Sequence, residues 1–186
     1  MEDLEATGLL DNTGAAPDLS RLLSRLPSDF SNGQQDFYFT PSHAVAEKYR
    51  RITNQRRQGA TVVISFRIPN AAIESLVSPT IQRIHWPSPE WKQLIWHCRR
   101  EHTLPSHLAR YKNATLVIGT IAARPASFYS NLQSWEQNGA GELFMVNVAV
   151  RGRYAGVQYV FSGRPDGQAF LVCIGLCETL EVLPTR

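Results

Sequence analysis

The sequence has few cysteines and no long apolar run. Its three cysteines, Cys98, Cys173 and Cys177, are an odd count without the spacing of a disulfide framework, so we expect reduced thiols. No window of the chain approaches the ~20 apolar residues that span a bilayer, which argues against a membrane partner. The opening stretch MEDLEATG lacks the basic and apolar regions of a signal peptide. We therefore expect a cytoplasmic protein.

Basic residues are absent from the first eighteen positions, which carry only acidic charge. This stretch is rich in Gly, Ala, Asp and Thr, and we expect residues 1–17 to form a flexible acidic tail. We expect residues 18–186 to form a single α+β globular domain, whose charge is more positive than the overall net charge of +3. A basic body of this kind attracts anionic ligands such as dinucleotides.

Metal-binding and nucleic-acid-binding signatures are also absent. His85, His97, His102 and His107 do not have the spacing of zinc ligands, and no pair of cysteines flanks them, so no metal site is expected. The basic residues between positions 48 and 57 lack the interleaved aromatic side chains of a nucleic-acid platform. Nucleic acid is therefore not the partner that we expect.

Local patterns predict an α+β order of elements, with a strand-rich C-terminal half. Thr40-Pro41 and Ser88-Pro89 each place a capping side chain before a proline, which is typical of a helix start. The pattern predicts helices over 18–26, 41–58, 89–102 and 128–137, strands over 37–39, 61–68, 115–121, 143–150, 156–161, 168–175 and 179–183, and a turn over 164–167.

Three stretches, taken in order, resemble small microbial and fungal proteins with the ADP-ribosyltransferase fold. They are "DFYFTPSHAVAEKY", then "TVVISFRIP" followed by "WPSPEWKQLIWHCRR", and finally "TLVIGTIA" with "GVQYVFS" beyond it. The resemblance covers roughly residues 29–162. It implies a split β-sandwich of mostly antiparallel strands with flanking helices, and a cleft between its halves that holds NAD as a substrate.

The resemblance also implies site residues and an activity. Tyr38 and Gln158 would be the catalytic residues, with Tyr38 stacked on the nicotinamide ring and Gln158 as the late polar residue. Thr40 would supply a hydroxyl group, and Phe39, Arg67 and His85 would complete the cofactor-binding set. The implied activity is transfer of ADP-ribose to a protein or another acceptor, or hydrolysis of NAD.

Two other functions remain open. The fold could serve as a cofactor-free cyclase or isomerase of a small molecule, in which a cleft accelerates the reaction by restricting the conformations of its ligand. It could also be a non-catalytic binding module. The chain has no histidine before Phe37, and Gln158 stands where an acidic residue would stabilise an oxocarbenium-like centre, which favours these two alternatives.

Each candidate also has a purely structural interpretation. Thr40 caps a helix in any protein, and strand alternation places Tyr38 on the side opposite Phe37 and Phe39. A polar residue such as Gln158 inside a strand usually faces solvent. The functional hypothesis therefore depends on one geometric expectation, that Tyr38 and Gln158 line a single groove.

Overall fold

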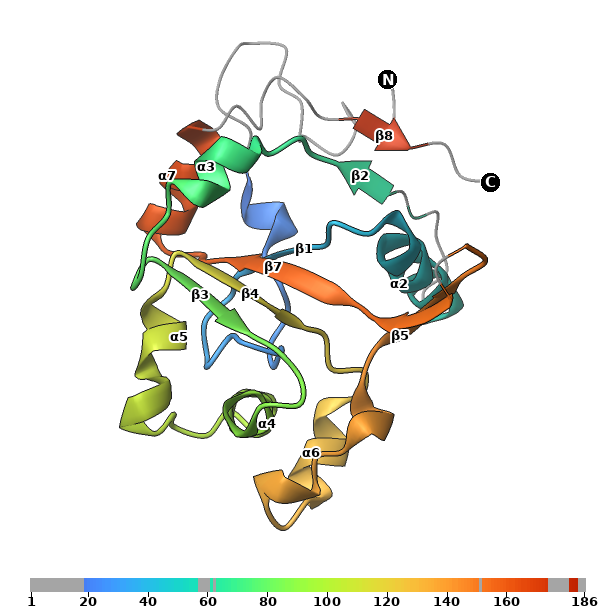
Figure 1. Ribbon diagram of the computed structural model, residues 1–186, viewed down its shortest axis with the longest axis vertical. Coiled ribbons are helices and arrows are strands. Elements are labelled where there is room, and N and C mark those ends of the chain that lie inside the picture. The colour runs from blue at the N-terminus through green and yellow to red at the C-terminus, as the bar shows by residue number, and fades with distance from the viewer. Residues whose placement is uncertain (1–18, 57–60, 62, 151, 174–180, 184–186) are drawn as a thin grey trace.

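A four-stranded sheet forms the centre of the molecule. The computed structural model describes residues 19–56, 61, 63–150, 152–173 and 181–183. The strand order is β1-β7-β4-β3, in which β7 is antiparallel to both of its neighbours and β3 is parallel to β4 (Figure 1). These strands are β1 (Phe37–Phe39), β3 (Ile81–Ile84), β4 (Leu116–Thr120) and β7 (Val157–Phe161).

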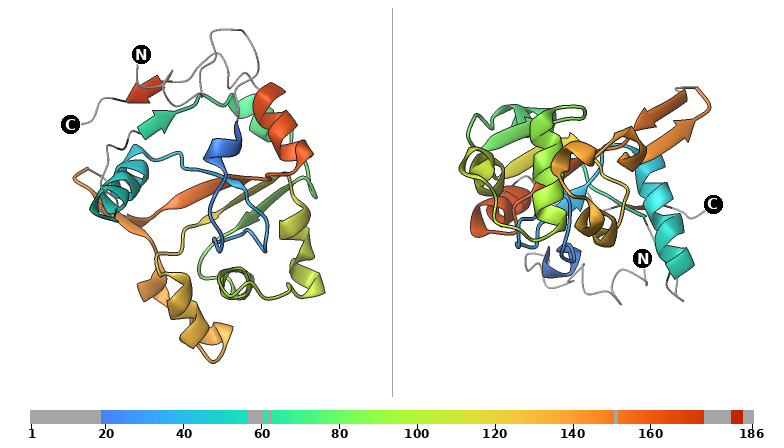
Figure 2. Two further views of the ribbon diagram at one scale, coloured as in Figure 1. Left: turned by 180° about the vertical axis from the view of Figure 1, so that it is seen from behind. Right: turned by 90° about the horizontal axis from the view of Figure 1, so that it is seen from below.

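Two small antiparallel ribbons accompany this sheet. One pairs β2 (Val63–Ser65) with β8 (Glu181–Leu183), and the other is the hairpin of β5 (Met145–Val148) and β6 (Gly152–Ala155). The hairpin projects from the body on the side where α2 (His43–Arg56) lies, as the right-hand view of Figure 2 shows. The chain is thus a mixed α/β protein whose central sheet is mostly antiparallel.

Helices cover both faces of the central sheet. On one face lie α4 (Pro89–Arg99), α5 (Ala109–Asn113) and α6 (Ala126–Asn131), and on the other lie α3 (Asn70–Glu74), α7 (Pro165–Cys173) and β2 (Figure 1). Short 3-10 turns complete the description: Leu19–Leu22, Ser106–Leu108, Trp135–Gln137 and Ala140–Glu142. None of the helices in the described residues is long and apolar enough to cross a membrane.

Each face of the sheet has its own apolar core. Strand alternation sends Val117 and Val160 toward α4, where Trp91 and Leu94 are fully buried. The opposite core holds Phe37, Phe161 and Leu171, with Ile81 and Ile118 from the neighbouring strands. The prediction that Phe37 and Phe39 face away from Tyr38 is confirmed, but both faces are covered, so Tyr38 also packs against a core.

The helix predicted after Ser88 is confirmed, although it ends at Arg99 instead of residue 102. Ser88 is the N-cap, and its hydroxyl accepts a hydrogen bond from the Trp91 backbone N–H at 3.2 Å. Pro89 is the first helical residue, and the side chains at helical spacing are all buried: Trp91, Leu94, Ile95 and Cys98. Burial of Cys98 raises the pKa of its thiol to about 12, which fits a structural, unreactive cysteine.

The strand predicted over 115–121 is also confirmed, as β4 (Leu116–Thr120), and the structure shows a close approach to it at Gly119. A Cβ atom added there would lie 2.6 Å from the Phe30 ring and 2.6 Å from the Ile84 carbonyl oxygen. Glycine is required because the loop that carries Phe30 packs directly on the backbone of the sheet. This loop, residues 24–36, contains no helix or strand, and it positions most of the site described below.

The turn predicted over 164–167 and the strand predicted over 168–175 are wrong where the structure describes them, because Pro165–Cys173 form α7; residues 174 and 175 lie outside the described residues. Pro165 and Asp166 occupy its first turn, where a missing N–H and an acidic side chain are both favourable. The Thr115 hydroxyl donates a hydrogen bond to Asp166 at 2.7 Å, and Leu171 is fully buried against the sheet. Pro-Asp-Gly therefore begins a helix here, because packing on the sheet outweighs the preference of these residues for a turn.

Several predicted boundaries are wrong. The helix expected over 18–26 is the short turn at Leu19–Leu22, after which Leu23 forms a bridge to Phe37. Helix α2 begins at His43 instead of Pro41, and β2 is three residues long and pairs with β8 instead of lying in the interior of the sheet. The predicted tail over 1–17 and the last two residues of the helix predicted over 41–58 lie outside the described residues.

Candidate functional site

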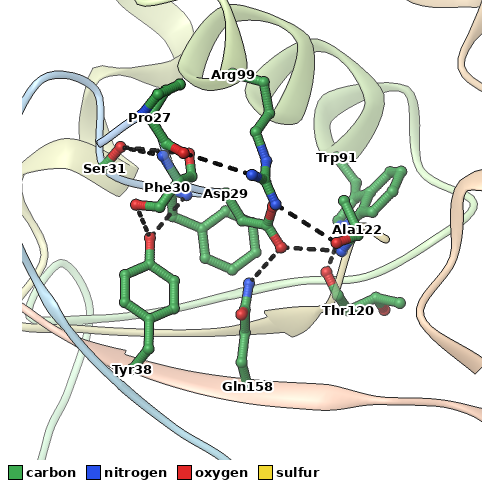
Figure 3. Close-up of polar contacts among 11 residues, drawn as sticks. Pro27, Asp29, Phe30, Ser31, Tyr38, Trp91, Arg99, Thr120, Ala122 and Gln158 are labelled. Carbon is green, nitrogen blue, oxygen red and sulfur yellow. Dashed lines mark hydrogen bonds and ion pairs between the residues drawn. The ribbon is translucent and has the colours of Figure 1, made fainter. Parts of the chain in front are cut away.

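Tyr38 and Gln158 project from the same face of two neighbouring strands. Tyr38 of β1 pairs with Val160 of β7, and Gln158 is two residues from Val160 on the same strand. Alternation along β7 therefore gives Gln158 and Val160 the same side of the sheet. Both polar side chains point toward the loop segment 27–31, which lies between the sheet and α4 (Figure 3). The structure thus brings the two predicted catalytic residues to one segment of the chain.

Tyr38 is bonded to that segment through its hydroxyl group. The hydroxyl oxygen lies 2.9 Å from the Ser28 hydroxyl and accepts the Phe30 backbone N–H at 3.1 Å. Burial, reinforced by the charge of Asp29, raises the pKa of Tyr38 well above its usual range, against the lowering effect of these hydrogen bonds. Tyr38 is therefore a neutral phenol that holds the backbone of the loop.

Gln158 is buried, with only 4% of its surface exposed, so its interpretation as a solvent-facing residue is wrong. Its side-chain Nε2 donates a hydrogen bond of 2.9 Å to Oδ2 of Asp29. Strand alternation alone could not reveal this partner, because Asp29 lies 129 residues away in the sequence. A polar residue on a covered face of a sheet needs such a partner, and here the loop supplies it.

Asp29 is the centre of the polar cluster, and no motif around it indicates this role. It is 2% exposed and receives hydrogen bonds on both carboxylate oxygens. Arg99 Nε donates to Oδ1 at 2.8 Å, and Arg99 Nη2 forms an ion pair with the same oxygen at 2.5 Å. The Ala122 backbone N–H donates to Oδ2 at 2.9 Å, beside the contact from Gln158 (Figure 3).

Arg99 is the last residue of α4, and its guanidinium group reaches down to the loop. Its remaining N–H groups point to the carbonyl oxygens of Pro27, at 3.4 Å, and Ala122, at 3.5 Å. Burial is the largest influence on the pKa of Arg99 and lowers it, but the charge and hydrogen bonds of Asp29 outweigh burial, and the pKa is raised. A buried pair of this kind is favourable only when its other donors and acceptors are satisfied, as they are here.

Thr40 and Phe39 have structural partners. The Thr40 hydroxyl donates to the Val157 carbonyl at 2.8 Å and accepts the Ser42 backbone N–H at 3.3 Å, so it joins β1, β7 and the start of α2. The Phe39 ring packs edge-on against Phe161 on the face opposite Tyr38, at a centroid distance of 5.8 Å. The Phe39 ring therefore lies on the face of the sheet opposite Tyr38 and Gln158.

Arg67 and His85 are both exposed and lie away from the Asp29 cluster. Arg67 follows β2, on the side of the opposite core. His85 follows β3, and its Nδ1 lies 3.4 Å from the Thr120 hydroxyl. Partial burial and the nearby charge of Arg83 lower the pKa of His85. Neither residue contributes to a shared site with Tyr38 and Gln158.

A second buried carboxyl group lies in the same loop, at Asp36. It is 7% exposed, and its Oδ1 accepts the Gly163 backbone N–H at 3.0 Å. Burial raises its pKa to about 6, although the Gly163 hydrogen bond and Arg164 oppose the rise. Asp36, Lys112 and Ser162 are among the residues around a cavity of about 10 Å³, which has room for a single water molecule. Tyr38 and Gln158 do not line this cavity.

Comparison of the chain with protein-family models, with curated proteins and with solved structures gives no match in any of the three. The functional argument therefore rests on the geometry of this chain.

The arranged side chains do not fit NAD. The hydroxyl groups of Tyr38 and Thr40 and the amide of Gln158 are all bonded within the chain, and Phe39 faces the other side of the sheet. A dinucleotide would need an open cleft at the place that segment 27–31 fills. Within the described residues, no group of three or more His, Cys, Asp or Glu side chains is placed to hold a metal ion.

Proposed function

We propose that this chain is a non-catalytic binding module for an acidic protein partner. The observation that supports the proposal is the charge of the outer surface of α2. Arg51 and Arg56 are exposed there, and neither forms a hydrogen bond or ion pair with another described residue. The single acidic residue of this helix, Glu47, is already paired with Arg50 at 3.0 Å. Both cations are exposed on this helix, and exposed cations attract an acidic partner.

The hairpin beside α2 adds apolar side chains next to this surface. Lys48 Nζ lies 2.5 Å from the Met145 carbonyl oxygen, which ties the helix to β5. The Tyr49 ring stacks on Phe144 at 4.4 Å and is 41% exposed, while Val150 at the hairpin tip is 95% exposed. Exposed apolar side chains beside arginines are typical of protein interfaces, whereas single-stranded nucleic acid requires a row of stacking aromatic side chains.

An enzyme of the ADP-ribosyltransferase fold acting on NAD is the second candidate. It is favoured by one observation, that Tyr38 and Gln158 lie on the same face of adjacent strands and reach the same loop segment. This candidate, like a cyclase or isomerase that uses the same place, requires segment 27–31 to leave the sheet. The binding module requires no such movement, and the geometry therefore favours it.

The binding proposal is tested with a fluorescent glutamate-rich peptide, titrated by anisotropy at low and at physiological salt. We expect binding that weakens as salt rises, and at least a tenfold loss of affinity in the double variant Arg51→Glu with Arg56→Glu. The matched control reverses two exposed arginines elsewhere, Arg83→Glu with Arg124→Glu, and retains most of the affinity. Equal losses in both double variants, or tighter binding of single-stranded DNA of the same charge, would contradict the proposal.

The second candidate is tested separately with NAD. A ligand present at a hundredfold excess over its dissociation constant stabilises a protein by about 2.7 kcal/mol, which a thermal-shift measurement detects easily. We expect no shift of the melting temperature with NAD and no release of nicotinamide on incubation. If the protein released nicotinamide and the Gln158→Ala variant did not, the NAD enzyme would become the better-supported function and the binding module would be rejected.

A further inference from the structure

The donors around Asp29 come from three elements that are held in place without it. Arg99 ends the eleven-residue helix α4, Ala122 follows β4, and Gln158 lies inside β7, which is paired on both sides. Their N–H groups converge on one carboxylate from different directions (Figure 3). Such a set of fixed donors can bind an anion, whether that anion is a side chain of the same protein or a free ion in solution.

Asp29 itself belongs to the irregular loop 24–36. The loop reverses direction at Asn32 and Gly33, whose φ angles are 36° and 81°. Its contacts with the sheet include the Asp29 carboxylate, the Phe30 ring over Gly119, and the hydrogen bonds of the Tyr38 hydroxyl with Ser28 and with the Phe30 N–H. The carboxylate is the charged member of this set, so the loop supplies a ligand and the sheet and α4 supply its binding site.

We propose that Arg99, the Ala122 N–H and Gln158 form a carboxylate-binding site in which Asp29 is the resident internal ligand, and that a free carboxylate takes this site when the Asp29 side chain is absent. The two oxygens have separate donors: Oδ1 faces the guanidinium group, and Oδ2 faces the Ala122 and Gln158 N–H groups. This division suits a planar anion with two oxygens. Formate and acetate are the ligands of the right class and size.

The inference is tested by removing the internal ligand and supplying a free one. The variant Asp29→Ala leaves the donors in place and opens a space of carboxylate size. We expect its melting temperature to rise by roughly 5 °C or more in 200 mM sodium formate relative to 200 mM sodium chloride, as mass action predicts for a ligand that binds only the folded state. The wild-type protein, whose site is filled, should show no difference between the two salts.

Two further variants separate a specific site from a general salt effect. Adding Arg99→Gln to Asp29→Ala removes the guanidinium group and should abolish the formate-dependent rise. Asp36→Ala removes a carboxyl group of similar burial from the same loop, but one whose hydrogen-bonding partner is a backbone N–H instead of a guanidinium group, and it should show little rise. An equal rise in all three variants would overturn the proposal.

Failure of Asp29→Ala to fold does not end the test. Folding is then followed by circular dichroism during refolding in formate or in chloride, with Asp29→Ser as a second variant that keeps a small polar side chain. Recovery of the folded signal in formate alone supports the site. The absence of any formate-specific recovery in both variants, or a melting temperature of Asp29→Ala equal to that of the wild type in chloride, would overturn it.

Discussion

Asp29 and Asp36 lie in the same loop and are almost equally buried, yet their surroundings differ. Asp29 accepts hydrogen bonds from a guanidinium group, a backbone N–H and a side-chain amide. Asp36 accepts one from the Gly163 N–H, and burial raises its pKa to about 6. Burial alone therefore does not determine how a carboxyl group behaves. The first is one half of a structural ion pair, and the second is a group that titrates near neutral pH.

The surroundings of the two carboxyl groups differ because Asp29 and Asp36 lie next to different elements of the fold. Asp29 faces α4, where Arg99 compensates its charge, and the pair connects the loop, the helix and the sheet. Asp36 lies near the start of β1, close to the 10 Å³ cavity, and Arg164 is the cation that acts on it. A perturbed pKa is often taken as a sign of an active site. Here desolvation explains the raised pKa of Asp36 without a substrate.

The largest effect should come from breaking the Asp29 pair. Replacing Arg99 with methionine keeps a similar volume but leaves a buried carboxylate without its cation. We expect a loss of about 3–5 kcal/mol in the free energy of unfolding, measured by urea denaturation at pH 7. The neighbouring Arg100 provides a matched control, because it donates to three carbonyl oxygens at the end of α6 and leaves no buried charge behind.

In that control, Arg100→Met should lose less, about 1–2 kcal/mol, because its three acceptors are neutral carbonyl groups that are partly open to solvent. Similar losses in the two variants would show that the ion pair of Asp29 with Arg99 stabilises the protein no more than the hydrogen bonds of Arg100 do. The proposed difference between Asp29 and Asp36 would then be wrong.

A second charge next to Asp29 should be almost as disruptive. Gln158→Glu replaces the amide donor, 2.9 Å from Asp29, with a carboxyl group. Repulsion should raise the pKa of the introduced group by about two units, which corresponds to a loss of about 3 kcal/mol at pH 7. Because an acid with a raised folded-state pKa is penalised only when ionised, the loss should shrink as pH falls toward 4. Gln158→Met should instead lose a smaller amount that does not depend on pH.

At Asp36, removing the charge should stabilise the protein, whereas Gln158→Glu, which adds a charge, should destabilise it. Its pKa is about 6 in the folded protein and 3.8 in an unperturbed chain, so the folded state binds the extra proton between these values. Stability contributed by this group is therefore present below pH 4 and is lost as pH rises through 6, by roughly 3 kcal/mol in total. Asp36→Asn, which keeps an oxygen for the Gly163 N–H, should stabilise the protein by about 2 kcal/mol at pH 7.

The measurement is a set of urea unfolding curves between pH 4 and 8 for the wild type and for Asp36→Asn. The two stability profiles should meet near pH 4 and diverge as pH rises. A constant difference across this range would mean that Asp36 does not titrate between pH 4 and 6 in the folded state, and the proposed distinction from Asp29 would be wrong.

Sequence reasoning succeeded where the information is local. Ser88-Pro89 and the apolar spacing from Trp91 to Cys98 predicted α4 correctly, and the β-branched run around Val117 predicted β4. The same local reasoning failed at Pro165, because a turn signal and a helix start share the same residues and only packing of Leu171 on the sheet decides between them. Strand β3 was missed because two polar residues separate its buried ends, Ile81 and Ile84.

The site was less predictable than the fold. Tyr38 and Gln158 were selected, and the structure places them on the same face, but their partner Asp29 lies in a loop with no motif. Arg99 lies near the end of a predicted helix, where a cation is favourable for local reasons, whereas its main partner is 70 residues away. Contacts across such separations leave no periodic signal in one sequence. A polar residue inside an otherwise apolar strand, such as Gln158, was the one available hint, and it fits a solvent-facing position equally well.

The smallest effect should come from Tyr38, at the edge of the Asp29 cluster. Tyr38→Phe removes a hydroxyl group that contacts Ser28 and the Phe30 N–H, but leaves the ring in the core and the ion pair intact. We expect a loss of about 1 kcal/mol in the free energy of unfolding, the usual contribution of one such hydrogen bond. Combined with Arg99→Met, the loss should be less than additive, because both residues hold the same loop segment. A double-mutant cycle by urea denaturation measures this coupling, and strict additivity would mean that Tyr38 and Arg99 hold the loop independently.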